Sequence, residues 1–117
     1  KKCQKHILEE ISRAGKGSFL AVLKLYGKEN NNFLSFPLEG YSLALDFKIE
    51  KGIFEFLNKL DKIVLTYHGR IYLAKDARVS KEVFEKGYPR INNFRKFREE
   101  KNMNKHFNSF QSKRVGL

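Results

Sequence analysis

Lys75 is the residue whose surroundings in the sequence most suggest chemistry. The apolar run from Arg70 to Ala74 predicts a strand, and Lys75 follows it directly, with Asp76 and Arg78 close behind. Charged residues at the end of a strand commonly face ligands. Lys75 can therefore serve a site, or it can be a rim lysine paired with Asp76. We expect Asp76 and Arg78 to fix the end of the strand rather than to take part in chemistry.

Two further predicted strands carry polar residues among apolar ones. Residues 18–26 are apolar on both faces, which predicts a central strand covered on two sides. Lys24 interrupts that run; its ammonium group either extends past the end of the strand or points into a site. Residues 41–50 alternate strictly, and the large apolar face predicts core. The opposite face is either solvent-facing surface or the floor of a pocket. It comprises Ser42, Ala44, Asp46, Lys48 and Glu50.

The composition narrows the class of protein. A net charge of +11 favours an anionic partner, such as nucleic acid, an acidic membrane surface or a smaller ligand, although a solvated lysine surface gives the same charge. A single cysteine, Cys3, excludes an internal disulfide, and three scattered histidines predict no metal site. A reducing, cytoplasmic setting follows by default. The chain lacks an initiator methionine, so we expect it to be a piece of a longer protein.

The remaining segments predict helices. Apolar residues recur at helical spacing in residues 3–14, from Gly52 to Val64, and again after Pro89, while Ser80 is a candidate N-cap for a helix ending at Gly87. Residues 101–117 are expected to be loop or short helix. The order is helix, strand, strand, helix, strand, helix, helix. It indicates one α+β domain over residues 1–117, with helices packed on a small, mainly antiparallel sheet.

Nucleic-acid binding is one functional alternative. An RNA-recognition sheet needs aromatic side chains on two adjacent central strands, within a segment of defined pattern. Residues 69–74 supply only one such aromatic, Tyr72, next to Arg70. The match to the RNA-recognition motif is therefore weak. Only the net charge still supports the alternative function, a basic α+β module that binds nucleic acid or another polyanion.

Three segments in order are similar to motifs of one enzyme family. They are residues 17–27 (GSFLAVLKLYG), residues 34–47 (LSFPLEGYSLALDF) and residues 69–78 (GRIYLAKDAR), the last followed by Tyr88-Pro89-Arg90. Together they resemble FAD-linked oxidases of the vanillyl-alcohol-oxidase superfamily, in the branch of the decaprenylphosphoryl-β-D-ribose 2'-oxidases and aldonolactone oxidases. The resemblance implies the C-terminal substrate domain of a two-domain flavoenzyme. The FAD-binding domain is expected upstream and is missing from this chain.

The resemblance also assigns roles to single residues. Lys75 matches a catalytic lysine that reaches both the flavin ring and the substrate hydroxyl being oxidised. Tyr72 matches a flavin-contacting tyrosine. It stands three residues before Lys75, so the two side chains can converge only if a turn or bulge lies between them. Lys24 matches a lysine of the substrate pocket, Asn31 stands where relatives have a glutamine in a mobile loop, and Ser42 stands where they often have asparagine. From the residues alone, Tyr72 could equally be core.

The implied activity is oxidation of a sugar or sugar-lactone hydroxyl, with hydride transfer to FAD. The fragment alone is expected to be inactive. Implied partners are a sugar or polyprenyl-phosphosugar-like substrate and the missing FAD-binding domain, with peripheral association at the inner face of the membrane. Asn31, Ser42 and Ala44 depart from the family pattern and leave the substrate open. The small residues at 42 and 44 nevertheless favour a pocket floor on that face of the sheet.

Overall fold

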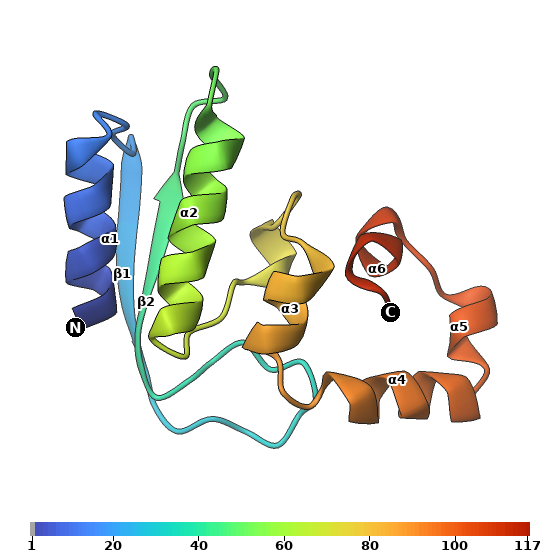
Figure 1. Cartoon of the computed structure of the whole chain (residues 1–117). Coiled ribbons are helices and arrows are strands. Elements are labelled where there is room, and N and C mark those ends of the chain that lie inside the picture. Colours follow the sequence, from blue (N-terminus) through green and yellow to red (C-terminus); the bar gives the residue numbers. More distant parts are fainter. Residues whose placement is uncertain (1) are drawn as a thin grey trace.

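The structure, a computed structural model, describes residues 2–117 and has the predicted α+β class (Figure 1). Two antiparallel strands form its sheet, and helices pack beside them. The strands are β1 (Leu20–Tyr26) and β2 (Gly40–Asp46). The helices are α1 (Lys2–Arg13), α2 (Ile53–Thr66), the 3-10 turn η1 (Leu73–Lys75), α3 (Lys81–Gly87), α4 (Ile91–Glu100), α5 (Met103–His106) and α6 (Phe110–Val115).

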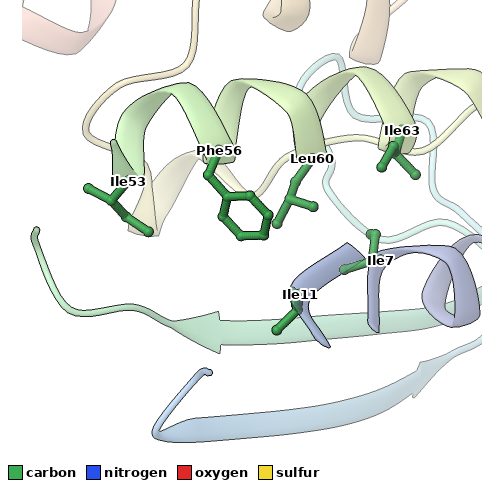
Figure 2. Packing of buried hydrophobic residues seen from close by; sticks show 6 residues of the cluster. All are labelled: Ile7, Ile11, Ile53, Phe56, Leu60 and Ile63. Atoms are coloured by element: carbon green, nitrogen blue, oxygen red, sulfur yellow. The ribbon is translucent and has the colours of Figure 1, made fainter. Parts of the chain in front are cut away.

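The first of two apolar clusters joins α1, α2 and β2. Residues spaced three or four apart along α2 point toward α1, as Figure 2 shows. The buried members are Ile7, Ile11, Ile53, Phe56, Leu60 and Ile63. The core face predicted for residues 41–50 comprises residues beyond the end of β2 as well, and its members Leu43, Leu45 and Phe47 pack against this cluster. Tyr41 and Ile49 of the same face are exposed, so the prediction of a core face is right only for its middle.

The second cluster lies among α3, α4 and α6. Its buried members are Val79, Phe84, Tyr88, Ile91 and Val115. Ser80 is the N-cap of α3, because its side chain accepts a hydrogen bond from the backbone N–H of Val83 at 3.2 Å. This cap and the end of α3 at Gly87 are both as predicted. The tail forms the short helices α5 and α6, within the range that the sequence allowed.

A buried ion pair connects the two clusters. Both carboxylate oxygens of Asp61, on α2, accept hydrogen bonds from the Arg78 guanidinium, at 2.7 and 2.8 Å. Arg78 also donates to the side chain of Asn58 and to the carbonyl oxygen of Leu57. Arg78 therefore fastens the segment before α3 to one face of α2, which is the structural role expected for it.

The predicted strand from Arg70 to Ala74 is wrong. The segment is extended only as far as Tyr72 and then turns into η1. Its backbone carbonyls are taken by side chains instead of by a neighbouring strand. Tyr88 Oη donates to Ile71 O at 2.8 Å, and Gln111 Nε2 donates to Leu73 O at 2.6 Å. Side-chain donors from later in the chain thus replace a sheet ladder.

The predicted cover of β1 is not formed within residues 2–117. The strand forms, but the first apolar cluster, between α1 and α2, includes residues of β2 and none of β1. All residues of β1 except Tyr26 are exposed, with Leu25 at 70% and Leu23 at 59%. Its one partner among residues 2–117 is β2, so β1 is an edge strand there. An apolar pattern on both faces, which usually means burial, here marks an uncovered surface.

Candidate functional site

Lys24 and Ser42 lie together on the face of the sheet that points away from α1 and α2. They are directly opposite each other in the β1–β2 register, and Val22 is opposite Ala44. Directly opposite residues in an antiparallel pair share a face, with Cβ atoms about 5 Å apart. This face alternates with the one that carries Leu43, which packs on the helices. The sheet thus brings together two of the predicted substrate-binding residues, and the small Ala44 lies beside them.

A chain of aromatic rings connects this face with Tyr72. Tyr26 follows Lys24 by two residues and so shares its face of β1. Its ring meets Phe36 edge-on at 6.0 Å between centroids, and Phe36 lies 4.8 Å from Tyr72. Tyr72 itself is 47% exposed, so it is not a core residue. Phe36 was not singled out from the sequence, although it stands within the second motif, and its contact with Tyr72 is visible only in the fold.

Arg70 fixes the two loops that carry these aromatic rings. Its guanidinium donates to Ser35 O at 2.6 Å and lies over the ring of Tyr88, 5.2 Å from the centroid. The side chain is only 9% exposed and approaches Glu29 at 3.8 Å. Arg70 therefore holds the loop before β2 against the segment before η1. This is a structural role, and it explains why Phe36 and Tyr72 meet.

The turn η1 brings Tyr72 and Lys75 close together, as the family resemblance requires. The backbone N–H of Lys75 donates to Tyr72 O at 3.4 Å, which closes a four-residue turn. In such a turn the first and fourth Cα atoms are less than about 7 Å apart. The two residues need not be on a strand to approach each other, and the incorrect strand prediction leaves their proximity intact.

Lys75 is exposed and forms no ion pair within residues 2–117. The expected alternative partner, Asp76, binds Arg114 instead, at 2.8 Å. Burial acts to raise the pKa of Asp76, but hydrogen bonds from Arg114 and from the backbone N–H groups of Arg78 and Val79 outweigh it and hold that pKa below its usual range. Asp76 is therefore fully engaged in structure, while the Lys75 ammonium group is available to a ligand.

Asn31 lies apart from these residues. It is exposed in the loop between β1 and β2, and no contact in the described part of the chain joins it to Lys24, Ser42, Tyr72 or Lys75. A hydrogen bond from Arg90, the N-cap of α4, to the carbonyl oxygen of Asn30 ties the loop to the start of that helix, at 2.9 Å. A contact of Asn31 with substrate stays a prediction.

Comparison with known proteins identifies what this chain is similar to. No protein-family model matches it. Over 113 residues, 97% of the chain, it is 41% identical to decaprenylphosphoryl-β-D-ribose oxidase of Mycolicibacterium smegmatis. Its sequence resembles part of an oxidase. The predicted resemblance is thereby confirmed.

The matched region is a small part of each relative. The chain spans 25% of the length of the M. smegmatis oxidase. A second relative, from Streptomyces coelicolor, carries the description "uncharacterized protein in mprA 5'region". It is 31% identical over 97% of this chain, which spans 31% of its length. No helix within residues 2–117 has both the length and the apolar character needed to cross a membrane.

Proposed function

We propose that this chain is the substrate domain of an FAD-dependent oxidoreductase that oxidises a hydroxyl group of a sugar. The similarity to decaprenylphosphoryl-β-D-ribose oxidase, over nearly the whole chain, carries this proposal. The FAD-binding domain would belong to the remainder of the parent protein. The chain alone would neither hold FAD firmly nor turn over, since it contains no glycine-rich loop between a strand and a helix to bind the pyrophosphate.

The candidate site suits a flavin and a sugar approaching from its open side. The exposed ring of Tyr72 is connected to this surface through Phe36, and Lys75 follows Tyr72 at the end of the turn η1. The sheet face, with Ser42 and Ala44, presents small side chains that leave room above it. Lys24 adds a second cation on that face. These residues fit a planar, electron-accepting ring with a polyhydroxylated substrate beside it.

Lys75 is the proposed catalytic residue. FAD, when bound, supplies the two-electron acceptor for the hydride that leaves the carbinol carbon of the sugar. A fixed ammonium group beside the flavin stabilises the negative charge that develops on the ring. The same group would donate a hydrogen bond to the oxygen of the hydroxyl being oxidised and stabilise that oxygen as its proton passes to water. Because Lys75 pairs with no carboxylate among residues 2–117, its full charge is available for both tasks.

Lys24 and Ser42 are the proposed substrate-binding residues. A hydroxyl side chain can hydrogen-bond a sugar hydroxyl in either direction, as donor or acceptor. A lysine on the same face suits an anionic group such as a phosphate. The name of the M. smegmatis relative describes a substrate with a polyprenyl phosphate on a pentose. We extend that class to this chain, and a lipid-linked sugar of this kind would place the parent enzyme at a membrane surface.

Nucleic-acid binding gains no support from the fold. Tyr72 lies outside the strands, in the approach to η1, and the sheet in the described residues has two strands. The adjacent aromatic residues of an RNA-recognition sheet are therefore not formed there.

The test is substrate-driven flavin reduction in the intact parent protein. Lys75→Met removes the charge and keeps the length of the side chain, and we expect it to slow reduction about 100-fold or more while flavin content stays unchanged. Lys105→Met, at an exposed lysine in α5, is the matched control and should reduce at the normal rate. Equal reduction rates in the Lys75 variant and the control would refute the assignment.

A second arm of the experiment addresses the substrate class. A polyprenyl-phosphopentose and a phosphate-free sugar lactone are compared as reductants of the flavin. We expect Lys24→Met to weaken the use of the phosphorylated substrate selectively. Equal losses with both substrates would remove phosphate recognition from Lys24.

A further inference from the structure

Helix α6 contacts the main chain on both sides of Lys75. The side-chain amide of Gln111 donates from Nε2 to Leu73 O at 2.6 Å and to Asp76 O at 3.2 Å. One of these carbonyls precedes Lys75 and the other follows it. A single side chain from the last helix thus bridges the two ends of the turn that carries the lysine.

Arg114, one turn further along α6, anchors the exit from the same turn. Its guanidinium donates to Asp76 Oδ2 at 2.8 Å and to Val79 O at 2.7 Å. The other carboxylate oxygen of Asp76 accepts from the backbone N–H groups of Arg78 and Val79, at 2.9 and 2.8 Å. The Asp76 side chain is 3% exposed, so the carboxylate at the centre of this network is buried.

The helix that makes these contacts is itself held at both ends. Ser109 and Ser112 form a reciprocal capping box at its start, and Gly116 ends it in the left-handed conformation at φ 75°. Arg95 donates to Gly116 O at 2.8 Å, and Val115 is fully buried in the second cluster. A six-residue helix is not stable on its own, so these anchors are what make α6 a fixed support.

Lys75 depends on this support because no side chain among residues 2–117 pairs with its ammonium group. It makes no ion pair in the described residues, and the internal hydrogen bond that closes its turn, from Lys75 N to Tyr72 O, is long at 3.4 Å. The position of the ammonium group is therefore set by the backbone, and Gln111 is the side chain that fixes that backbone on both sides.

We propose that Gln111 and Arg114 are positioning residues that hold Lys75 at the flavin and the substrate hydroxyl. This inference rests on the proposed function, because it gives α6 a task only if Lys75 acts in the reaction. The two residues touch neither substrate nor cofactor in this scheme. They act through the main chain of residues 73–79, and their effect should therefore vanish once Lys75 is gone.

Gln111→Met is the informative variant. It keeps the length of the side chain, removes both donated hydrogen bonds and changes no charge. Removal of Arg114 would instead leave the buried Asp76 carboxylate without its partner and could prevent folding. Lys113→Met, at an exposed position on α6, is the matched control. All variants are made in the intact FAD-containing protein, singly and combined with Lys75→Met.

Three measurements are compared: the rate of flavin reduction at saturating substrate, the substrate affinity, and amide hydrogen exchange in residues 71–79 of the flavin-free protein. Small misplacement of a reacting group can cost about 100-fold in rate. We expect Gln111→Met to slow reduction about 10- to 100-fold, with substrate affinity nearly unchanged. Exchange in residues 71–79 should rise, while exchange in α2 stays as in the control.

The combined variant decides between positioning and general stabilisation. If Gln111 acts through Lys75, the protein with both substitutions should reduce at the rate of Lys75→Met alone. Multiplied losses, or faster exchange spread over the whole domain, would overturn the inference and leave the proposed function intact. A normal rate in Gln111→Met would do the same. A normal rate in Lys75→Met would overturn the proposed function and this inference together.

Discussion

The ion pair between Asp61 and Arg78 is predicted to be a main determinant of stability, because it is both buried and the link between the two apolar clusters. The Asp61 side chain is 4% exposed and that of Arg78 is 21% exposed. Arg78→Met would leave a buried carboxylate without a counter-charge. Breaking a pair of this kind from one side costs about 3–5 kcal/mol, and the partial exposure of Arg78 places the expected loss near the lower limit.

That loss converts into a measurable change in melting temperature. The entropy of unfolding is about 2.1 cal/mol/K per residue, and for the 117 residues of the chain this gives roughly 0.25 kcal/mol/K. A loss of about 3 kcal/mol therefore corresponds to a decrease of about 12 °C in the melting temperature. In urea, the midpoint should decrease while the slope of the transition stays the same.

A double-mutant cycle tests the reasoning. Asp61→Leu combined with Arg78→Met replaces both charged partners by apolar groups, which is often close to neutral for a buried pair. The double variant should therefore be more stable than Arg78→Met alone. If Arg78→Met loses less than about 1 kcal/mol, the range of a surface pair, the pair is not buried in solution. If the two single losses add up in the double variant, the penalty does not arise from the unpaired carboxylate.

Three further outcomes are expected. The pKa of Asp76 lies below its usual range, so its contribution to stability is present at neutral pH and is lost as the pH falls through that lowered value. The difference in unfolding free energy between the wild type and Asp76→Asn, measured by urea unfolding, should therefore shrink in that pH range. A difference that does not change with pH would contradict this prediction. Burial raises the pKa of Tyr88 to about 12, so its contribution to folding stability is complete below about pH 10 and declines as the pH rises toward 12. Tyr88→Phe should lose about 1–3 kcal/mol of stability at neutral pH, because Ile71 O is left without its donor. A loss that stays constant up to pH 12 would argue against a buried phenol. A Cβ at Gly69 would lie 2.8 Å from Val64 Cγ1 and 3.1 Å from Val64 O, so Gly69→Ala should destabilise by about 1–3 kcal/mol in thermal melts, and an unchanged melting temperature would show that α2 ends differently.

Local signals in the sequence predicted the elements that depend on neighbours in the chain. The apolar spacing of α2 and the N-cap Ser80 needed no distant partner to be recognised, and both predictions are confirmed. The strand before Lys75 was predicted incorrectly, because its carbonyls are satisfied by Tyr88 and Gln111, whose approach no local pattern reveals. The wrong element was assigned, yet the residue that it was meant to present, Lys75, is indeed exposed.

In the candidate site, too, the contacts that follow from local patterns could be predicted from the sequence, and those between distant loops could not. Strand alternation and register place Lys24 opposite Ser42, so this pair could be inferred once β1 and β2 were known to be neighbours. The connection to Tyr72 could not, since it passes through Phe36 and depends on the hold of Arg70 on Ser35 O. Contacts of this kind join loops far apart in sequence, where neither periodicity nor propensity carries information.

The exposure of β1 has a practical consequence for handling the chain. Within residues 2–117, one edge of β1 has no partner strand. Its backbone donors and acceptors, together with its exposed apolar side chains, can pair with another molecule of the same chain. The isolated chain should therefore self-associate as its concentration rises, in spite of a net charge of +11 that opposes close approach. Because salt screens that repulsion, high-salt buffers should increase the self-association of the purified chain, and low ionic strength is the condition in which it should stay dispersed.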